Sequence, residues 1–350
     1  MENQHLTYFK VENFKKFNSL EVKDIGQFNL IVGDNNVGKT VFLESLLMTE
    51  KNIDRSIENL HHTLCRRLLH IHPYNIRSEN PRLPEENYFD FLKNDKNIES
   101  ISFNWNNYKI AFKDIQISKL VEQDFKKELK HNYNIGRPNL WVKIYLNDLY
   151  EELQFMYLDD FKTKFDHGYL PIINKNAGYG KDLNDLFKEI EFENLVLIKE
   201  SLKNLFFEDF EDLFKRYFFN RELLAIKLKR FNDFVPITYF GDGFIEFLRY
   251  AIEIIKSKNS KLMIDEIANG IHYSRLKDFW LNIMKICKEL NVQLFATTHS
   301  KECEIAFAEA LKEIKEEKNG RLISLQEEKK GIKSYVYQIE NLDLDYEYRG

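Results

Sequence analysis

Apolar and polar positions alternate near the start of the chain as they do in β-strands. The alternation runs over Tyr8–Phe14 and returns over residues 20–23, with Asn18 and Ser19 as the expected turn, so it predicts an antiparallel pair at a domain edge. Phe28–Val32 is a short, mostly apolar run with no alternation, which is typical of a strand buried on both faces. A glycine-rich loop and a helical spacing of apolar residues follow it directly.

The same order of strand and helix returns near the other end of the chain. Apolar residues at helical spacing predict helices over residues 245–255 and 276–290, and two apolar runs predict buried strands over residues 262–264 and 292–297. Strands that alternate with helices favour an α/β fold. We therefore expect one sheet whose strands come from both ends of the chain.

The middle of the chain, residues 52–234, differs from the two ends. It is rich in Lys, Asn, Phe and Glu, and apolar residues recur at helical spacing over residues 182–219. We therefore predict a mostly helical insert there. Long coiled-coil arms are not expected, because no heptad pattern is sustained. Residues 1–51 and 235–350 would then form the two halves of one head domain.

The C-terminal part of that head is predicted to be a tail. Residues 312–333 are predicted to be a solvated charged stretch with a turn at Asn319 and Gly320, and residues 335–339 a final strand.

The composition narrows the class of protein. The 350 residues are 43% hydrophobic, enough to bury a sizeable core, and 51 basic against 56 acidic residues leave a net charge of −5. A constitutive nucleic-acid coat is therefore excluded, and any nucleic-acid contact must be a local patch. The start of the chain has no leader pattern, no apolar run is long enough to span a membrane, and the three scattered cysteines form no CxxC pair, so we expect a cytoplasmic protein.

The strongest chemical signal is the phosphate-binding loop after Phe28–Val32. Its glycines let backbone N–H groups curl around a phosphate, and the helix that follows points its positive end at the anion. Lys39 would neutralise the β and γ oxygens of a triphosphate, and the Thr40 hydroxyl would bind Mg²⁺. The loop consists of Gly33, Asp34, Asn35, Asn36, Val37, Gly38, Lys39 and Thr40.

Three further signals follow buried strands or open a helix. Asp265 and Glu266 end the strand at residues 262–264, where Asp265 can reach the metal and Glu266 can orient or deprotonate water. His299 follows the next strand and can polarise the γ-phosphate or hold that water. Gly241, Asp242 and Gly243 open a helix whose N–H groups can clasp a phosphate, although Asp242 is also a good N-cap.

These signals, in this order, resemble the ABC-type ATPases, and within them the RecF, SMC and OLD-like AAA family ATPases of prokaryotic defence systems. Residues 11–17 resemble that branch's NF+SF strand, residues 265–272 its DEiENGlH stretch, and residues 295–300 its TTHS sequence. The resemblance covers both ends of the chain and not the insert. It implies a P-loop NTPase head of the ABC type, with an antiparallel N-terminal β-subdomain and the mostly helical insert.

The resemblance also implies roles for single residues. The loop over residues 33–40 would be Walker A, Asp265 and Glu266 would be Walker B with the catalytic glutamate, residues 268–272 the D-loop and His299 the switch histidine. Residues 241–243 take the signature position, which in the family reads the partner subunit's ATP. Two features depart from the family pattern: the signature lacks serine and glutamine, and Ala268 replaces the branch's usual glutamate.

A signature loop about 200 residues after the phosphate loop is typically too far away to touch its own nucleotide, so a homodimer with two ATP molecules sandwiched between its subunits is expected. Hydrolysis would remove the γ-phosphate contact and open the dimer. We expect a Mg²⁺-dependent ATPase that serves as the sensor or motor of a defence or DNA-maintenance system, with a separate effector such as a nuclease.

Other functions compete with this one. A GTPase needs Asn-Lys-x-Asp, and residues 174–177 lack the acid; a fused TOPRIM nuclease needs a domain after His299, where only a short tail follows. Arg67 and His72 weakly resemble a HEPN ribonuclease motif, and Cys65 with nearby histidines suggests zinc, although a basic amphipathic helix explains the same residues. A slowly hydrolysing scaffold that holds an effector is the third alternative.

Overall fold

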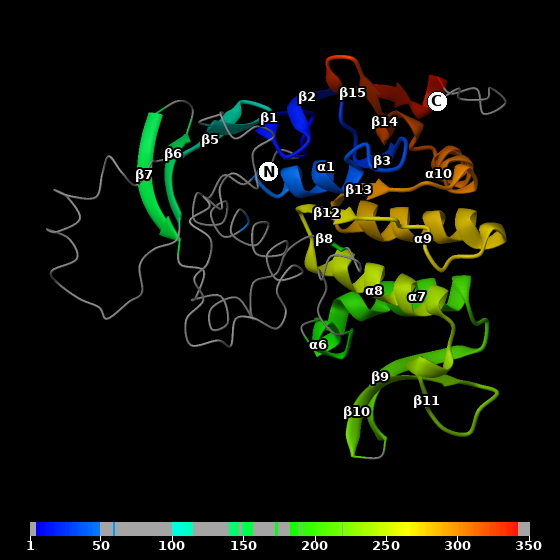
Figure 1. Cartoon of the computed structure of the whole chain (residues 1–350). Coiled ribbons are helices and arrows are strands. Elements are labelled where there is room, and N and C mark those ends of the chain that lie inside the picture. The colour runs from blue at the N-terminus through cyan, green and yellow to red at the C-terminus, as the bar shows by residue number, and fades with distance from the viewer. Residues whose placement is uncertain are drawn as a thin grey trace, which may run out of the picture.

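The computed structural model describes residues 5–49, 59, 100–114, 140–146, 149–156, 172–173, 183–188, 190, 192–218 and 220–341. Within these ranges the strands form two six-stranded sheets, called A and B here, and a small third sheet. Figure 1 shows sheet B in the middle of the described part, with helices below it. Sheet A starts with the N-terminal strands, drawn in blue, and extends to the left.

Sheet A is antiparallel and begins with the predicted N-terminal strand pair. Its turn lies at Lys15 and Lys16 and not at Asn18 and Ser19, because this register pairs Phe14 with Phe17 and buries both rings. Positive φ at Asn13 (62°) and Lys15 (50°) makes the tight turn possible. The strand order is β2 (Phe17–Lys23), β1 (Tyr8–Phe14), β4 (Ser100–Trp105), β5 (Tyr108–Asp114), β6 (Leu140–Leu146) and β7 (Leu149–Met156).

Sheet B joins both ends of the chain, as predicted. All its strands are parallel except the edge strand β15, which pairs antiparallel with β14. The order is β15 (Gly331–Gln338), β14 (Gly320–Glu328), β3 (Phe28–Val32), β13 (Gln293–Thr297), β12 (Lys261–Ile264) and β8 (Ile172–Ile173). The expected α/β architecture with an antiparallel N-terminal sheet is therefore confirmed.

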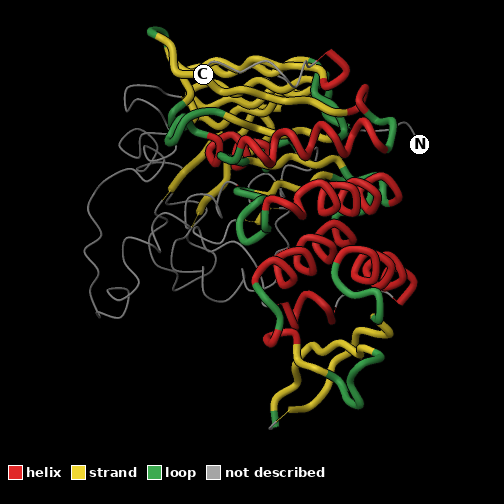
Figure 2. The backbone as a smooth tube through the Cα atoms, turned by 90° about the vertical axis from the view of Figure 1, so that its right-hand side faces the viewer, coloured by secondary structure: helices red, strands yellow, loops and turns green. Residues whose placement is uncertain are grey.

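The two faces of sheet B carry separate hydrophobic cores. Along β3, Leu30 enters one core and Ile31 the other, which is why this strand is buried at every position. Helix α1 (Lys39–Leu46) packs between sheets A and B. The helices on the opposite face, visible in red below the large sheets in Figure 2, are α6 (Leu183–Lys188), α7 (Phe192–Leu205), α8 (Asp242–Lys256), α9 (Leu276–Glu289) and α10 (Lys301–Glu313).

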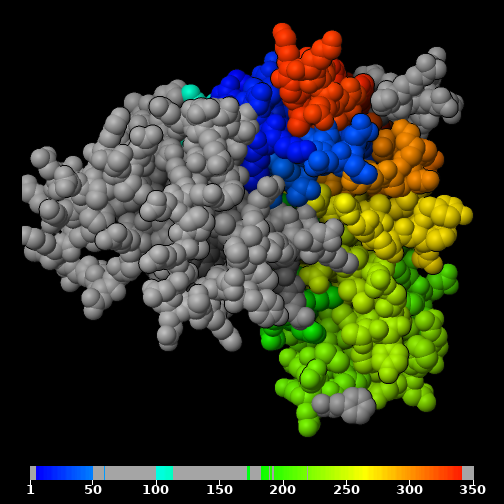
Figure 3. Space-filling view, in the orientation of Figure 1, coloured from blue at the N-terminus to red at the C-terminus, as the bar shows by residue number. Residues whose placement is uncertain are grey.

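The third sheet lies at the far end of this helical layer. It is antiparallel and contains β11 (Val235–Pro236), β10 (Arg221–Leu228) and β9 (Phe210–Phe218). Figure 3 shows it as the green lower end of the described surface. Short 3₁₀ turns complete the described chain: η5 (Ile237–Tyr239), η6 (Tyr273–Arg275), η7 (Glu317–Asn319) and η8 (Ile339–Asn341).

The prediction of a mostly helical insert is wrong for the described part of residues 52–234. Helices α6 and α7 are where the helical spacing placed them, but β9 occupies the rest of that stretch and pairs with β10 over its whole length. The range also contains the strands β4 to β8. In β4 apolar residues alternate with polar ones, a strand period that composition alone conceals.

The prediction of a solvated tail over residues 312–333 is also wrong. β14 pairs with β3 inside sheet B and buries Leu322, Ile323 and Leu325, although charged residues flank these apolar positions. The final strand is confirmed as β15. Among the described helices, none is long and apolar enough to cross a membrane. The division of the chain at residues 52 and 234 stays a prediction.

An ion pair fixes β14 beside the loop that enters β3. Arg321 donates from Nε to Asp24 Oδ2 (3.0 Å) and from Nη2 to Asp24 Oδ1 (2.8 Å), a bidentate contact with a nearly buried guanidinium. This contact holds the pKa of Asp24 below its usual value of 3.8, against the opposing effect of burial.

We expect Asp24→Asn to lower the free energy of unfolding by about 1 kcal/mol at pH 7, because half of the Asp24 side chain is exposed and water screens the pair. The depressed pKa means that this stabilisation is present above pH 3.8 and is lost as the pH falls through the folded-state pKa. Urea unfolding at pH 7 and at pH 2.5 tests this. The control Glu21→Gln removes an exposed pair with Lys23 and should change little; equal losses in both variants would contradict the prediction.

Candidate active site

The predicted site residues meet at the carboxyl edge of sheet B, where open α/β sheets bind ligands. β3 leads into the loop over residues 33–40, β12 into Asp265 and Glu266, and β13 into His299. Because the register places Ile264 level with Ala296, and Ala296 level with Leu30, the three strands end at nearly the same height. Segments more than 200 residues apart in sequence are thereby brought side by side.

The loop over residues 33–40 has the backbone of a phosphate cradle. Gly33 (φ 140°), Asn36 (φ 67°) and Gly38 (φ 108°) adopt positive φ, and α1 begins directly after them. A Cβ on Gly33 would lie 2.3 Å from the Leu325 carbonyl oxygen, so only glycine fits there. The loop therefore curls tightly against β14 and leaves the helix N-terminus at its mouth.

Lys39 lies over this loop and is almost fully buried. Its Nζ donates to the carbonyl oxygens of Gly33 (2.6 Å) and Asp34 (2.9 Å) and lies 3.3 Å from His299 Nδ1. Burial lowers the pKa of Lys39, while the carboxylates of Asp265, Asp34 and Glu266 oppose that shift. The ammonium is thus poised between the loop and the acids.

Asp265 links the loop to β13 through both of its carboxylate oxygens. Thr40 Oγ1 donates to Oδ2 at 2.7 Å, and Thr297 Oγ1 donates to Oδ1 at 2.6 Å. The Asp265 backbone N–H donates to Ile173 of β8 at 2.9 Å. Asp265 is therefore held from three segments of the chain.

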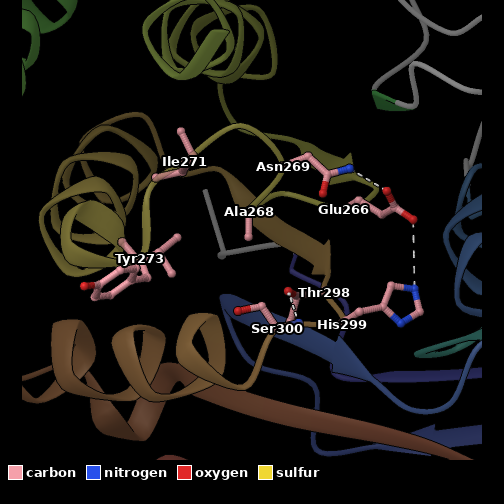
Figure 4. Close-up of a pocket in the computed structure, with 9 residues that line it drawn as sticks. Glu266, Ala268, Asn269, Ile271, Tyr273, Thr298, His299 and Ser300 are labelled. Atoms are coloured by element: carbon pink, nitrogen blue, oxygen red, sulfur yellow. Dashed lines mark hydrogen bonds and ion pairs between the residues drawn. The ribbon is translucent and has the colours of Figure 1, made fainter. Parts of the chain in front are cut away.

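Glu266 and His299 border an open pocket of about 350 Å³, drawn in Figure 4. The Glu266 carboxylate accepts a hydrogen bond from Asn269 Nδ2 (2.5 Å) and lies 3.9 Å from His299 Nε2. Both side chains are more than one third exposed, so solvent reaches them. The other ring nitrogen of His299, Nδ1, faces Lys39. The imidazole of His299 therefore lies between Lys39 and Glu266, the predicted base.

The signature-like residues are not at this loop. Gly241 caps α8 on the opposite face of sheet B from α1, and no hydrogen bond between described residues joins residues 241–243 to residues 33–40. Gly243 instead packs on residues 268–272, where a Cβ would lie 2.7 Å from the Gly270 carbonyl oxygen. Asp242 makes no side-chain cap to α8, so the simple N-cap alternative is not supported.

Sequence reasoning missed three contacts at this edge: the Thr297 hydroxyl, the Asn269 amide and the Lys16 ammonium, which donates to the Asn36 carbonyl oxygen. The available signal for Thr297 was a polar residue at the end of one buried strand, β13, when the neighbouring strand β12 is followed by acidic residues. The alternative nuclease and zinc residues, Arg67, His72 and Cys65, lie outside the described residues. The chemical roles of the predicted site residues stay predictions.

Comparison with known proteins identifies the family. Residues 28–302 match the model of the family described as "AAA domain, putative AbiEii toxin, Type IV TA system", more than half of the chain. The chain belongs to this AAA-domain family. Its membership confirms the predicted class, an AAA family ATPase.

This AAA domain is also similar to individual proteins. A Helicobacter pylori protein named ATP/GTP phosphatase is 26% identical, with 97% of each chain covered. An SMC head domain from Thermotoga maritima matches with a TM-score of 0.49 at 13% identity, covering 95% of this chain and 99% of the other. An Smc head bound to the C-winged helix domain of ScpA matches with a TM-score of 0.49 at 12% identity, covering 96% and 99%.

We expect Gly33→Ala to destabilise the AAA domain by about 1–3 kcal/mol, because the new methyl group strains the positive φ and collides with the Leu325 carbonyl group. Gly241→Ala is the matched control, since its Cβ meets nothing within 4 Å and its φ is −65°. Thermal unfolding of both variants measures the difference. A Gly33→Ala variant as stable as Gly241→Ala would show that the loop does not have this shape.

Proposed function

We propose that this AAA domain binds ATP with Mg²⁺ at the carboxyl edge of sheet B and hydrolyses it there to ADP and phosphate. The observation that carries this proposal is the meeting of the Lys39 ammonium, the Asp265 carboxylate and the Glu266 carboxylate around one phosphate loop. Cradle, metal-binding acid and base are the parts that phosphoryl transfer requires.

The donor atoms present fit Mg²⁺. The Thr40 hydroxyl and the Asp265 carboxylate offer adjacent oxygen ligands, and no cluster of three or more His, Cys, Asp or Glu side chains in the described ranges holds a metal by itself. Mg²⁺ suits such a site because it keeps several waters and takes ligands from phosphates. When bound, it would offset the charge of the β- and γ-phosphates.

Hydrolysis requires a water oxygen to attack the γ-phosphorus while the bond from that phosphorus to the ADP oxygen breaks. We assign Glu266 as the carboxylate that accepts the water's proton, because its oxygens face the pocket and the His299 ring. Lys39 stabilises the negative charge on the phosphate oxygens and the ADP leaving group. His299 then orients the water or the γ-phosphate between these two groups.

We propose a homodimer, and the position of the signature-like loop supports it. Residues 241–243 lie on the face of sheet B opposite α1, away from the phosphate loop of their own copy, so they would be free to contact nucleotide on a second copy. ATP bound between two copies would hold the dimer closed, and loss of the γ-phosphate would favour opening.

The most detailed part of the proposal is the biological role of the protein. The family description names a toxin of a toxin–antitoxin system, which supports a role in defence, and we propose a cytoplasmic sensor or motor that acts on a separate effector such as a nuclease. Buried free thiols at Cys287 and Cys303 are consistent with a reducing compartment.

Lys39→Ala is expected to abolish ATP binding, because the ammonium is the cation of the cradle. Glu266→Gln should keep binding and lower kcat by about 10²- to 10⁴-fold, since an amide cannot accept the proton. Isothermal titration and phosphate release measure the two effects, with the exposed Lys312→Ala as control. Unchanged hydrolysis by a folded Lys39→Ala variant would refute the site.

With ATP and Mg²⁺, the Glu266→Gln variant should sediment as a dimer, because hydrolysis no longer opens it. Adding Gly241→Trp should keep the protein monomeric while leaving ATP binding unchanged, since the side chain points into open space in one copy and blocks a partner in the dimer. Sedimentation velocity with and without ATP tests this. Dimerisation that survives Gly241→Trp would place the contact elsewhere.

A further inference from the structure

Thr297 ends β13 with a fully buried hydroxyl that serves two site residues at once. Its Oγ1 accepts a hydrogen bond from the Glu266 backbone N–H (2.8 Å) and donates one to Asp265 Oδ1 (2.6 Å). This hydroxyl contacts both the proposed metal-binding acid and the backbone of the proposed base.

The sheet register produces this contact. Ile264 of β12 is level with Ala296 of β13, so the next residues along each strand, Asp265 and Thr297, are neighbours across parallel strands. Thr297 is also tied in through its main chain, because its carbonyl oxygen accepts the Ile267 N–H at 3.0 Å. The hydroxyl is therefore fixed by the rigid sheet and not by the exposed loop.

The contact fixes two geometries that the proposed chemistry needs. Glu266 has a positive φ of 55°, which is costly for a residue with a side chain and persists only where surrounding contacts impose it. The bond from Thr297 also occupies one oxygen of Asp265, so the other faces Thr40. Without the hydroxyl, the carboxylate could rotate and the Glu266 backbone could relax.

We propose that Thr297 is the positioning residue of the ATPase site: its hydroxyl sets the rotation of the Asp265 carboxylate toward Mg²⁺ and holds Glu266 in its strained conformation. This inference rests on the proposed function of the same site. Thr297 acts through the two acids, because the two hydrogen bonds of its hydroxyl go to Asp265 and to the Glu266 backbone. The neighbouring Thr298 differs, because its hydroxyl accepts from the Ser300 N–H at 3.1 Å and serves the start of α10.

The test compares Thr297→Val, which removes the hydroxyl and keeps the shape, with Thr297→Ser, which keeps the hydroxyl. For Thr297→Val we expect kcat to fall about tenfold or more, the scale of one hydrogen bond to a charged group, with the KM for ATP changed less than about threefold. The Mg²⁺ concentration for half-maximal activity should rise by a similar factor. Thr297→Ser should restore each value to within about threefold.

Two measurements do not depend on turnover. Titration of ATP in EDTA should give the wild-type affinity for Thr297→Val, whereas the gain in affinity on adding Mg²⁺ should shrink. A crystal structure of Thr297→Val should show Glu266 leaving positive φ. Thr49→Val, which removes another buried hydroxyl that donates to Leu46 of α1, is the matched control and should change none of these values.

Each other outcome overturns the inference. A folded Thr297→Val variant with wild-type kcat and Mg²⁺ response refutes it, as does one that loses only thermal stability. Equal losses in Thr297→Ser would show that the hydroxyl is not the cause. If the wild-type protein itself binds no ATP, the proposed function fails instead, and the Glu266 conformation in the Thr297→Val crystal still decides whether Thr297 holds it.

Discussion

The parallel pairing of β3, β13 and β12 is the constraint on which the rest of the molecule depends. Each strand ends in a different chemical group, and the shared register places a phosphate loop, a hydroxyl and an acidic pair at one edge. The hydrogen bonds Thr40–Asp265–Thr297–Glu266 then connect segments that are 225 residues apart in sequence. A slip of one residue in β12 would turn Asp265 to the other face and break this chain.

The two hydrophobic cores make that register rigid. Sheet B is packed by α1 on one face and by α8, α9 and α10 on the other, so its central strands have no freedom to shift. Such a scaffold can impose unfavourable backbone conformations, and at its edge Asn36 and Glu266 have positive φ, as does Gly33. The strain is stored where the proposed chemistry occurs.

The motifs and the strands that carry them were predictable because their signals are local. The loop over residues 33–40, the acids after β12 and His299 after β13 are all short patterns that follow apolar runs. Strands β4 to β7 of sheet A and the strands of the third sheet were missed because their Phe-rich, charged segments fit helix and strand periods equally well until a pairing partner is known; β9 needs β10 to be a strand. β14 could not be predicted for the same reason, because its charged sequence becomes a buried strand only through pairing with β3. The contacts of Thr297 could not be predicted either, because they depend on the register between β12 and β13, which neither strand reveals alone.

The contacts of Glu266 connect catalysis to movement. Asn269 Nδ2 donates to the Glu266 carboxylate, and Asn269 lies within residues 268–272, the stretch that resembles a D-loop, where Gly243 packs against Gly270. The orientation of the Glu266 carboxylate toward an incoming water therefore depends on Asn269. Because Gly243 lies in the loop proposed to meet a second copy, a partner that presses on residues 241–243 also acts on the D-loop and, through Asn269, on Glu266. In the proposed homodimer, closure and activation of the base would then be one event, and a lone subunit would not turn over ATP.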